Sequence, residues 1–401
     1  MREVLTLNSQ ADLPGQRKRA LMGSLSVQIA GEAVLLPSGT PDQSLDPGDQ
    51  LLAEHGAPSG GQRVLVLGAG NGVLPVFCAR RVGQGEVLVV DQRSHALAVA
   101  AATAALNGAT ARFISTTDLS RLPAGSVNHA LINIAFQPNS VRLVELLGET
   151  QRLTEPGARV YLAGARDRGA DTAIKRLGEV FGRAQLAAYR KGYRVGVAVR
   201  SEAAMPPAAA PQLELMEVEL RGSHYTLEAH SGVFARGGLD PAAALLATAI
   251  EVSSGDKVLD LGCGSGIVGM VAARLAPQGH VWLVDTNTEA VALTQRNVER
   301  NAIPNATVLV SDSTAAVADQ RFDVVVCNPP FHEGRSAARS LGLRLINDAM
   351  HVLPPGGRCF VVANRFLPYE TAMRERLNDV REVAGDTRYK VLRGSGLYRS
   401  G

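Results

Sequence analysis

The chain of 401 residues repeats itself at a nearly constant offset of 194 positions. The segment VLVLGAGNG at 64–72 matches VLDLGCGSG at 258–266. Polar residues keep the same spacing in three pairs: Asp91 and Asp285, Asn107 and Asn301, and Asp118 and Asp312. A unit this long is a duplicated domain and not a solenoid repeat. The chain therefore folds as two similar domains, each large enough to bury its own core.

The boundary between the copies is expected at SEAAMPPAAAP, residues 201–211, whose prolines and alanines show no apolar periodicity and are typical of a linker. This gives domains at 1–200 and 212–401. Each copy alternates short β-branched segments with helix-like stretches, which predicts an α/β fold of two tandem Rossmann-like domains. Each has a mostly parallel sheet with helices on both faces. Ligands bind such sheets at the carboxyl ends of the strands.

A glycine-rich turn follows a predicted strand in the second copy, DLGCGSG at 260–266. Glycines allow a ligand to approach the backbone closely, where a Cβ would clash. The same turn also satisfies the dinucleotide pattern GxGxxG, so by itself it does not separate a nicotinamide enzyme from a methyltransferase. Asp285, at the end of the next strand, is placed to bind ribose hydroxyls, with a helix N-cap as the alternative.

The discriminating motif is NPPF at 328–331, directly after the apolar strand FDVVVC at 322–327. The side-chain oxygen of Asn328 and the carbonyl of Pro329 are two acceptors, which match the two N–H donors of an exocyclic amine. The prolines fix the backbone that presents these acceptors. Phe331 offers a face on which a flat base can stack. The alternative is a plain proline turn after a buried strand.

With these motifs the chain resembles the class I S-adenosylmethionine methyltransferases that act on amino groups. Within them it is most similar to the bacterial ribosomal RNA guanine-N2 methyltransferases of the RsmC and RlmG types. The resemblance covers essentially the whole chain. It is carried by the duplication, the glycine turn and three further segments: GVF to GLD at 232–240, NPPFH at 328–332, and VANRFLPY at 362–369. The end of the last segment, FLPY at 366–369, looks more like the small-subunit type.

The resemblance implies methyl transfer from S-adenosylmethionine to N2 of a guanosine in ribosomal RNA, with 16S RNA favoured over large-subunit RNA. Asn328, Pro329 and Phe331 would hold the amine. The implied cofactor residues are Asp260, Gly262, Gly264 and Gly266 for the methionine part, Asp285 for the ribose and Asp312 for the adenine. Candidate substrate contacts are Phe234, Arg236, His332, Phe366 and Tyr369. His332 could instead simply be exposed, and Phe366 and Tyr369 could be core aromatics.

Two other functions stay open. One is methylation of a different amine, such as adenine N6 or a protein glutamine, although those families typically carry NPPY. The other is a non-catalytic RNA-binding or ribosome-assembly protein that retains an ancestral fold. The intact Asp260, Asp285 and NPPF argue against the second.

The first copy lacks the residues that carry this chemistry. Val66 stands where Asp260 is in the second copy, and NIAF at 133–136 stands where NPPF is. We therefore expect this domain to be catalytically inactive. Residues 1–200 carry 22 Lys and Arg against 16 Asp and Glu, net +6, and the remainder is net −3. This asymmetry suits RNA docking by the first domain, with Arg190, Lys191 and Arg194 as first candidates.

Composition bounds the remaining possibilities. The chain has no apolar run near the roughly 18 residues that span a bilayer, and its first residues lack the order of a signal peptide. Its four cysteines show neither a CxxC pair nor a histidine cluster, so no zinc site or disulfide framework is indicated. We expect a cytoplasmic monomer that uses no metal and binds ribosomal RNA or a ribosomal subunit.

Overall fold

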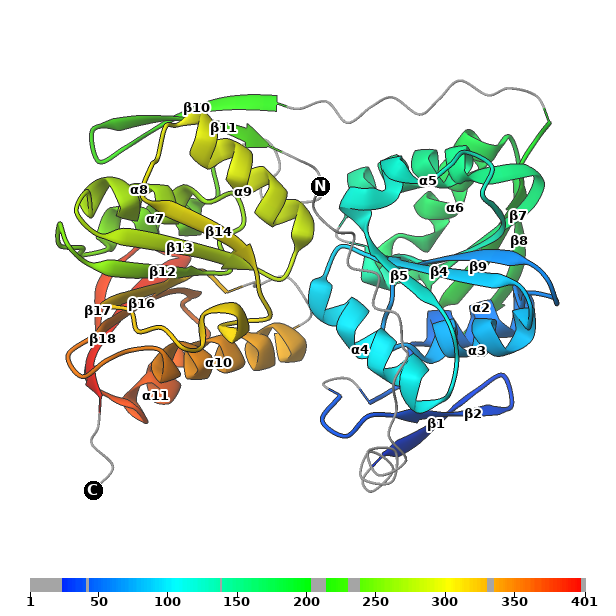
Figure 1. The fold of residues 1–401 in the computed structure, drawn as a ribbon, viewed down its shortest axis with the longest axis horizontal. Coiled ribbons are helices and arrows are strands. Elements are labelled where there is room, and N and C mark those ends of the chain that lie inside the picture. The colour runs from blue at the N-terminus through cyan, green and yellow to red at the C-terminus, as the bar shows by residue number, and fades with distance from the viewer. Residues whose placement is uncertain are drawn as a thin grey trace. The chain divides into compact units, whose positions relative to one another are not determined.

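The computed structural model describes residues 24–40, 43–137, 139–202, 214–229, 239–329 and 335–397. Four predicted site residues lie outside these ranges: Phe234, Arg236, Phe331 and His332. Pro330 and most of the expected linker lie outside them as well. The chain divides into two compact units, Met1–Pro211 and Gln212–Gly401 (Figure 1), and each is described by itself.

The first unit contains a seven-stranded sheet in the order β5-β4-β3-β6-β7-β9-β8. The pairs β7/β9 and β8/β9 are antiparallel and the others are parallel. The strands are β3 (Arg63–Leu67), β4 (Glu86–Asp91), β5 (Arg112–Ser115), β6 (Val127–Asn133), β7 (Thr154–Ala165), β8 (Ala184–Arg190) and β9 (Tyr193–Val199). The α-helices are α2 (Pro47–His55), α3 (Val73–Val82), α4 (Ser94–Leu106), α5 (Ser140–Leu153) and α6 (Ala170–Phe181).

The second unit repeats this topology in the order β14-β13-β12-β15-β16-β18-β17. Here β16/β18 and β17/β18 are the antiparallel pairs. The strands are β12 (Lys257–Leu261), β13 (His280–Asp285), β14 (Ala306–Val310), β15 (Val324–Cys327), β16 (Arg358–Asn364), β17 (Leu377–Gly385) and β18 (Tyr389–Leu397). The α-helices are α7 (Pro241–Ala249), α8 (Ile267–Leu275), α9 (Thr288–Arg300), α10 (Arg335–His351) and α11 (Tyr369–Arg374). The predicted tandem Rossmann-like fold is confirmed.

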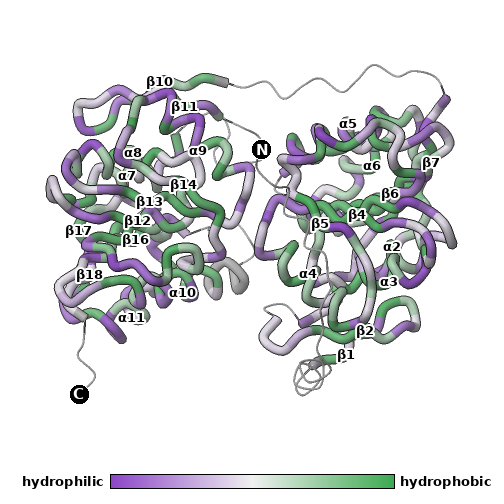
Figure 2. Tube along the Cα trace, in the orientation of Figure 1, coloured by the Kyte–Doolittle hydropathy of each residue, from purple (hydrophilic) through white to green (hydrophobic). Residues whose placement is uncertain are grey.

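Helices cover both faces of each sheet because the central strands are apolar on both sides (Figure 2). In β3, Val64 and Val66 pack against α2, α3 and α4, whereas Leu65 and Leu67 face α5 and α6. The second unit divides in the same way, with α7, α8 and α9 on one face of its sheet and α10 and α11 on the other. No helix among the described residues is long and apolar enough to cross a membrane.

An antiparallel hairpin precedes each sheet, β1 (Leu25–Ile29) with β2 (Glu32–Leu36) and β10 (Glu214–Leu220) with β11 (Ser223–Ala229). A repeated asparagine attaches each hairpin to a helix end. Asn107 exchanges two hydrogen bonds with the backbone of Leu35, at 3.0 and 2.7 Å. Asn301 makes the same pair with Thr226, at 2.9 and 2.8 Å. The duplicated Asn107 and Asn301 are therefore explained by structure in both units.

Candidate active site

Asn328 and the predicted cofactor residues of the second unit meet at the carboxyl edge of its sheet. Strand β12 lies between β13 and β15, and Leu261 is paired with both Val284 and Cys327. The residues that follow these three strands are therefore neighbours. This brings the glycine turn, Asp285 and Asn328 together at the point where the strand order reverses, which is the usual ligand site of such sheets.

None of the described residues closes over the first two glycines of the turn. Gly262, Gly264 and Gly266 have φ of 80°, 55° and 83°, a left-handed conformation that favours glycine. A Cβ built on Gly262 or Gly264 would meet no described atom within 4 Å, whereas one on Gly266 would lie 2.7 Å from Thr294 of α9. Gly266 is thus required for packing, and the first two glycines leave room for a ligand against the backbone.

Asp260 is an acidic residue at a core position. It lies two positions after Val258 on β12, so the two side chains share one face of the sheet. Asp260 is 3% exposed, and one of its oxygens accepts the N–H of Gly269 at 2.8 Å. Burial, with a smaller contribution from nearby Asp285, raises the pKa of this carboxyl to about 7. A buried carboxyl is costly unless a partner compensates it. The Gly269 N–H compensates part of this cost, and the cationic amine of a bound cofactor would compensate more of it.

Asp285 ends β13, and its carboxylate holds two loops in place. It accepts the N–H of Gly264 at 3.0 Å and that of Asn287 at 2.8 Å. The N-cap of α9 is Asn287, whose side chain accepts from Glu289. The alternative interpretation of Asp285 as that helix cap is therefore wrong. Burial raises its pKa, against backbone hydrogen bonds that lower it.

Asp312 follows β14 at the same edge, and its place near the adenine stays a prediction. Its carboxylate accepts a hydrogen bond of 2.5 Å from the Arg344 guanidinium on α10. Both side chains are partly exposed. The ion pair holds the Asp312 carboxylate in one orientation, and the sequence motifs gave no indication of Arg344.

Asn328 presents an unsatisfied acceptor. Its Nδ2 donates to Asp240 at 2.8 Å, and its Oδ1 is buried without a hydrogen-bond partner among the described residues. Leaving a buried acceptor unpaired costs about 1 to 3 kcal/mol. The two residues after Asn328 are prolines, which have no N–H to offer it. An amine placed at this edge would satisfy this oxygen.

The first unit shows which hydrogen bond the prolines of the second unit prevent. There Asn133 is followed by a 3-10 turn, Ile134–Phe136, and its Oδ1 accepts the N–H of Ala135 at 3.0 Å. Ala135 is the counterpart of Pro330. The acceptor that Asn328 keeps available is therefore already bonded in the first unit.

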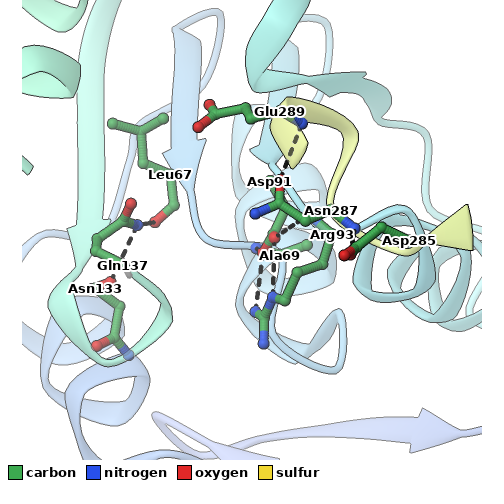
Figure 3. A network of polar contacts seen from close by, with 9 residues as sticks. All are labelled: Leu67, Ala69, Asp91, Arg93, Asn133, Gln137, Asp285, Asn287 and Glu289. Atoms are coloured by element: carbon green, nitrogen blue, oxygen red, sulfur yellow. Dashed lines mark hydrogen bonds and ion pairs between the residues drawn. The ribbon is translucent and has the colours of Figure 1, made fainter. Parts of the chain in front are cut away.

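The rest of the first unit's site is filled by its own side chains. Cβ atoms built on Gly68 and Gly70 would lie 2.8 and 3.1 Å from the Phe136 ring side chain. The Arg93 guanidinium donates to both oxygens of Asp91, the counterpart of Asp285, at 3.1 Å each (Figure 3). The cavity left beside Gly68, Asp91 and Phe136 has a volume of about 10 Å³. This is room for about one water molecule.

The two aromatic substrate candidates after β16 differ sharply in exposure. Phe366 is 69% exposed in the turn after β16, the strand that pairs with the one Asn328 follows. Tyr369 is fully buried in the core that α10 and α11 share with the sheet. Tyr369 is therefore a core aromatic, and the expectation that it contacts substrate is wrong; Phe366 stays a candidate.

Asp240 was not predicted as a site residue. It lies just before α7, caps that helix by accepting the N–H of Ala242 at 3.0 Å, and also holds Asn328. The only sequence signal was the repeated Leu-Asp-Pro, at 45–47 and 239–241. That repeat indicates a helix start and says nothing about a partner 88 positions away.

A family model described as the methyltransferase small domain matches the chain twice, over residues 41–196 and 224–393. Several curated relatives carry the name ribosomal RNA large subunit methyltransferase G. The relative from Aeromonas hydrophila is 29% identical over 364 residues, which is 88% of this chain and 93% of its own length. The relative from Aeromonas salmonicida is 28% identical over 267 residues, 66% of this chain and 70% of its own.

A solved structure also matches both units. It is the T. thermophilus 16S rRNA N2 G1207 methyltransferase (RsmC) in complex with AdoMet and guanosine. The TM-score is 0.76 at 26% sequence identity, and the match covers 94% of this chain and 99% of the other.

Proposed function

Because the chain belongs to the methyltransferase small domain family, we propose that it transfers the methyl group of S-adenosylmethionine to the N2 amine of a guanosine in ribosomal RNA. The second unit carries the reaction. The observation on which the proposal rests is the buried Oδ1 of Asn328, which accepts no hydrogen bond from the described residues, beside the open glycine turn.

The protein's part in the reaction is to hold the methyl donor and the amine in line. The cofactor supplies an electrophilic methyl group on a sulfonium sulfur. Asn328 Oδ1 and the Pro329 carbonyl accept the two N–H groups of N2, which raises electron density on the nitrogen and orients its lone pair. The N–CH3 bond forms as the S–CH3 bond breaks, and the extra proton of the amine leaves to solvent. Positioning and electrostatic complementarity account for the rate.

We assign the cofactor residues their parts of the cofactor from the family resemblance. The Asp260 carboxylate offsets the charge of the amine at the methionine end, Asp285 accepts from the ribose hydroxyls, and Asp312 lies near the adenine. The backbone of Gly262 and Gly264 forms the floor. In the first unit the corresponding place is taken by Phe136 and by the Arg93–Asp91 ion pair, so this unit binds no cofactor.

The preferred RNA is that of the large subunit. The segment at 366–369 pointed to the small subunit, and the T. thermophilus protein is named for 16S RNA, but the curated relatives are named for the large subunit. Deleting the gene should remove one N2-methylguanosine from large-subunit RNA, as measured by mass spectrometry of nuclease fragments. Loss from 16S RNA would reassign the subunit, and unchanged N2-methylguanosine in both RNAs would contradict the proposed function.

The first unit docks the RNA. Its positive charge is concentrated in residues 151–200, which carry 11 Lys and Arg against 4 Asp and Glu. Two of the expected docking residues are engaged within the unit: Arg190 pairs with Glu54, and Arg194 with Asp171 at 2.6 Å. These two are therefore poor choices. Lys191 is exposed in the turn between β8 and β9 and has no ion pair among the described residues.

The better docking surface lies at the carboxyl edge of the first sheet. Arg168 follows β7 there, and like Lys191 it is exposed and forms no ion pair with a described residue. Tyr189, at the end of β8, is 75% exposed and can stack on a base. Phosphate contacts of this kind give affinity with little sequence discrimination.

Reversing both charges, in Arg168→Glu/Lys191→Glu, should weaken RNA binding and reduce the slope of log K against log salt concentration by about 2. The matched control is Arg159→Glu/Arg183→Glu. It makes the same charge change at exposed residues near the opposite edge, where Ala184 pairs with Ala198. Equal losses in both double variants, measured by fluorescence anisotropy at several salt concentrations, would contradict a local docking surface.

Three expectations stay predictions from the sequence: a monomeric state, independence of metal and a cytoplasmic location. The proposed substrate is in accord with the last of these.

A further inference from the structure

We propose that Asp240 is the positioning residue that fixes the orientation of the Asn328 amide, so that the oxygen and not the nitrogen faces the amine to be methylated. This inference rests on the proposed function and adds to it a residue that makes no contact with the reacting atoms. It is carried by the hydrogen bond of 2.8 Å from Asn328 Nδ2 to Asp240 Oδ2.

The orientation matters because the two ends of an amide are opposite in kind. Rotating the Asn328 side chain by half a turn would exchange Oδ1, an acceptor, for Nδ2, a donor. An exocyclic amine brings N–H donors, so the rotated amide would set donor against donor. A carboxylate only accepts, and Asp240 can therefore bind the Nδ2 end of Asn328 but not the Oδ1 end.

Asp240 is itself held by the start of α7. Its Oδ1 accepts the N–H of Ala242 at 3.0 Å, and Pro241 occupies the first helical position. One carboxylate oxygen thus caps the helix and the other holds the amide. The position of the Asn328 side chain is thereby fixed relative to α7, which packs in the core through Leu246 and Ala247.

The first unit shows why the second depends on this one contact. The Asn133 amide is fixed by three hydrogen bonds: Nδ2 donates to Asp46 at 2.9 Å and to Asp49 at 2.8 Å, and Oδ1 accepts from Ala135 at 3.0 Å. In the second unit Ala243 replaces Asp49, and Pro330 replaces Ala135. Among the described residues only Asp240 still holds the amide of Asn328. The changes that make the acceptor available also leave its orientation to a single carboxylate.

The test uses Asp240→Ser in the full chain, because serine is a good N-cap but its hydroxyl is one bond shorter than the carboxylate. Asp46→Ser is the matched control, since Asp46 also caps its helix, α2, and also accepts from the asparagine amide, both through Oδ1. We expect single-turnover methyl transfer to fall about 10-fold in Asp240→Ser at saturating RNA and cofactor, because a loosened contact group is misplaced. Cofactor affinity and the melting temperature should match those of Asp46→Ser, which should keep the wild-type rate. A wild-type rate in Asp240→Ser would overturn the proposal.

Two further measurements separate positioning from a general structural effect. In an Asn328→Ala background, Asp240→Ser should cause no additional loss of rate; a further 10-fold loss would show that Asp240 acts independently and would overturn the proposal. The side-chain amide signal of Asn328, assigned by its absence in Asn328→Ala, should shift in the nitrogen-proton spectrum of Asp240→Ser without any RNA. An unchanged signal would overturn the hydrogen bond itself. If wild-type protein methylates no ribosomal RNA, the proposed function fails, and the spectrum still decides whether Asp240 holds the amide.

Discussion

Replacing Asn328 by alanine is expected to lower turnover at least ~100-fold while the affinity for S-adenosylmethionine stays close to that of the wild type. The side chain is not among the groups that hold the cofactor. In the proposed mechanism its Oδ1 orients the amine, and the interaction strengthens as the nitrogen gains positive charge in the transition state. Single-turnover methyl transfer with saturating cofactor and RNA measures this directly, and calorimetric titration measures cofactor affinity.

The duplication supplies a control for this variant. Asn133→Ala removes the corresponding amide from the first unit, where Ala135, Asp46 and Asp49 already consume its hydrogen bonds. It is expected to lower stability without changing the single-turnover rate. A loss in Asn328→Ala confined to RNA affinity, with an unchanged rate at saturation, would contradict the role assigned to Asn328.

Replacing Asp260 by alanine is expected to abolish cofactor binding by the whole protein. Hydrogen bonds to a charged group contribute about 1.5 to 3 kcal/mol each, and the second unit is the only part of the described chain with an open glycine turn next to such a carboxylate. Titration calorimetry on the wild type should give one cofactor per chain.

Val66→Ala is the matched control, because Val66 occupies the place of Asp260 in the first unit and is fully buried. It should lower the free energy of unfolding by opening a small cavity, with one cofactor still bound per chain. Binding of one cofactor per chain to Asp260→Ala at wild-type affinity would show that the carboxylate is not needed. A second equivalent of cofactor bound to the wild type would show that the first unit is not closed.

The fold and the main site could be predicted from the sequence because their signals are local or repeated. The short apolar runs at 64–67 and 258–261 indicate buried strands, and the nearly constant offset between the copies predicts the same topology for both units. Asp260 interrupts an otherwise apolar strand, and Val66 restores the pattern. A charge at that position is informative without any structure.

What the sequence could not provide depends on partners that are distant along the chain. Asp240 contacts Asn328 across 88 positions, and nothing in the sequence near either residue indicates this. Arg190 was a first candidate for RNA docking because the first half of the chain is net positive, but it pairs with Glu54 on α2. Tyr369 was placed beside the substrate from its position after a strand, whereas the packing of α11 places its side chain in the core.

Because Phe136 and Arg93 fill the first site, the stabilities of the two units should depend differently on the concentration of the cofactor. A ligand stabilises only the folded form that binds it, by an amount that grows with the logarithm of its concentration. The second unit therefore becomes harder to unfold as S-adenosylmethionine accumulates. The first unit, where Phe136 and the Arg93–Asp91 ion pair take the corresponding place, is expected to keep the same stability with and without S-adenosylmethionine, which thermal unfolding at several cofactor concentrations would measure.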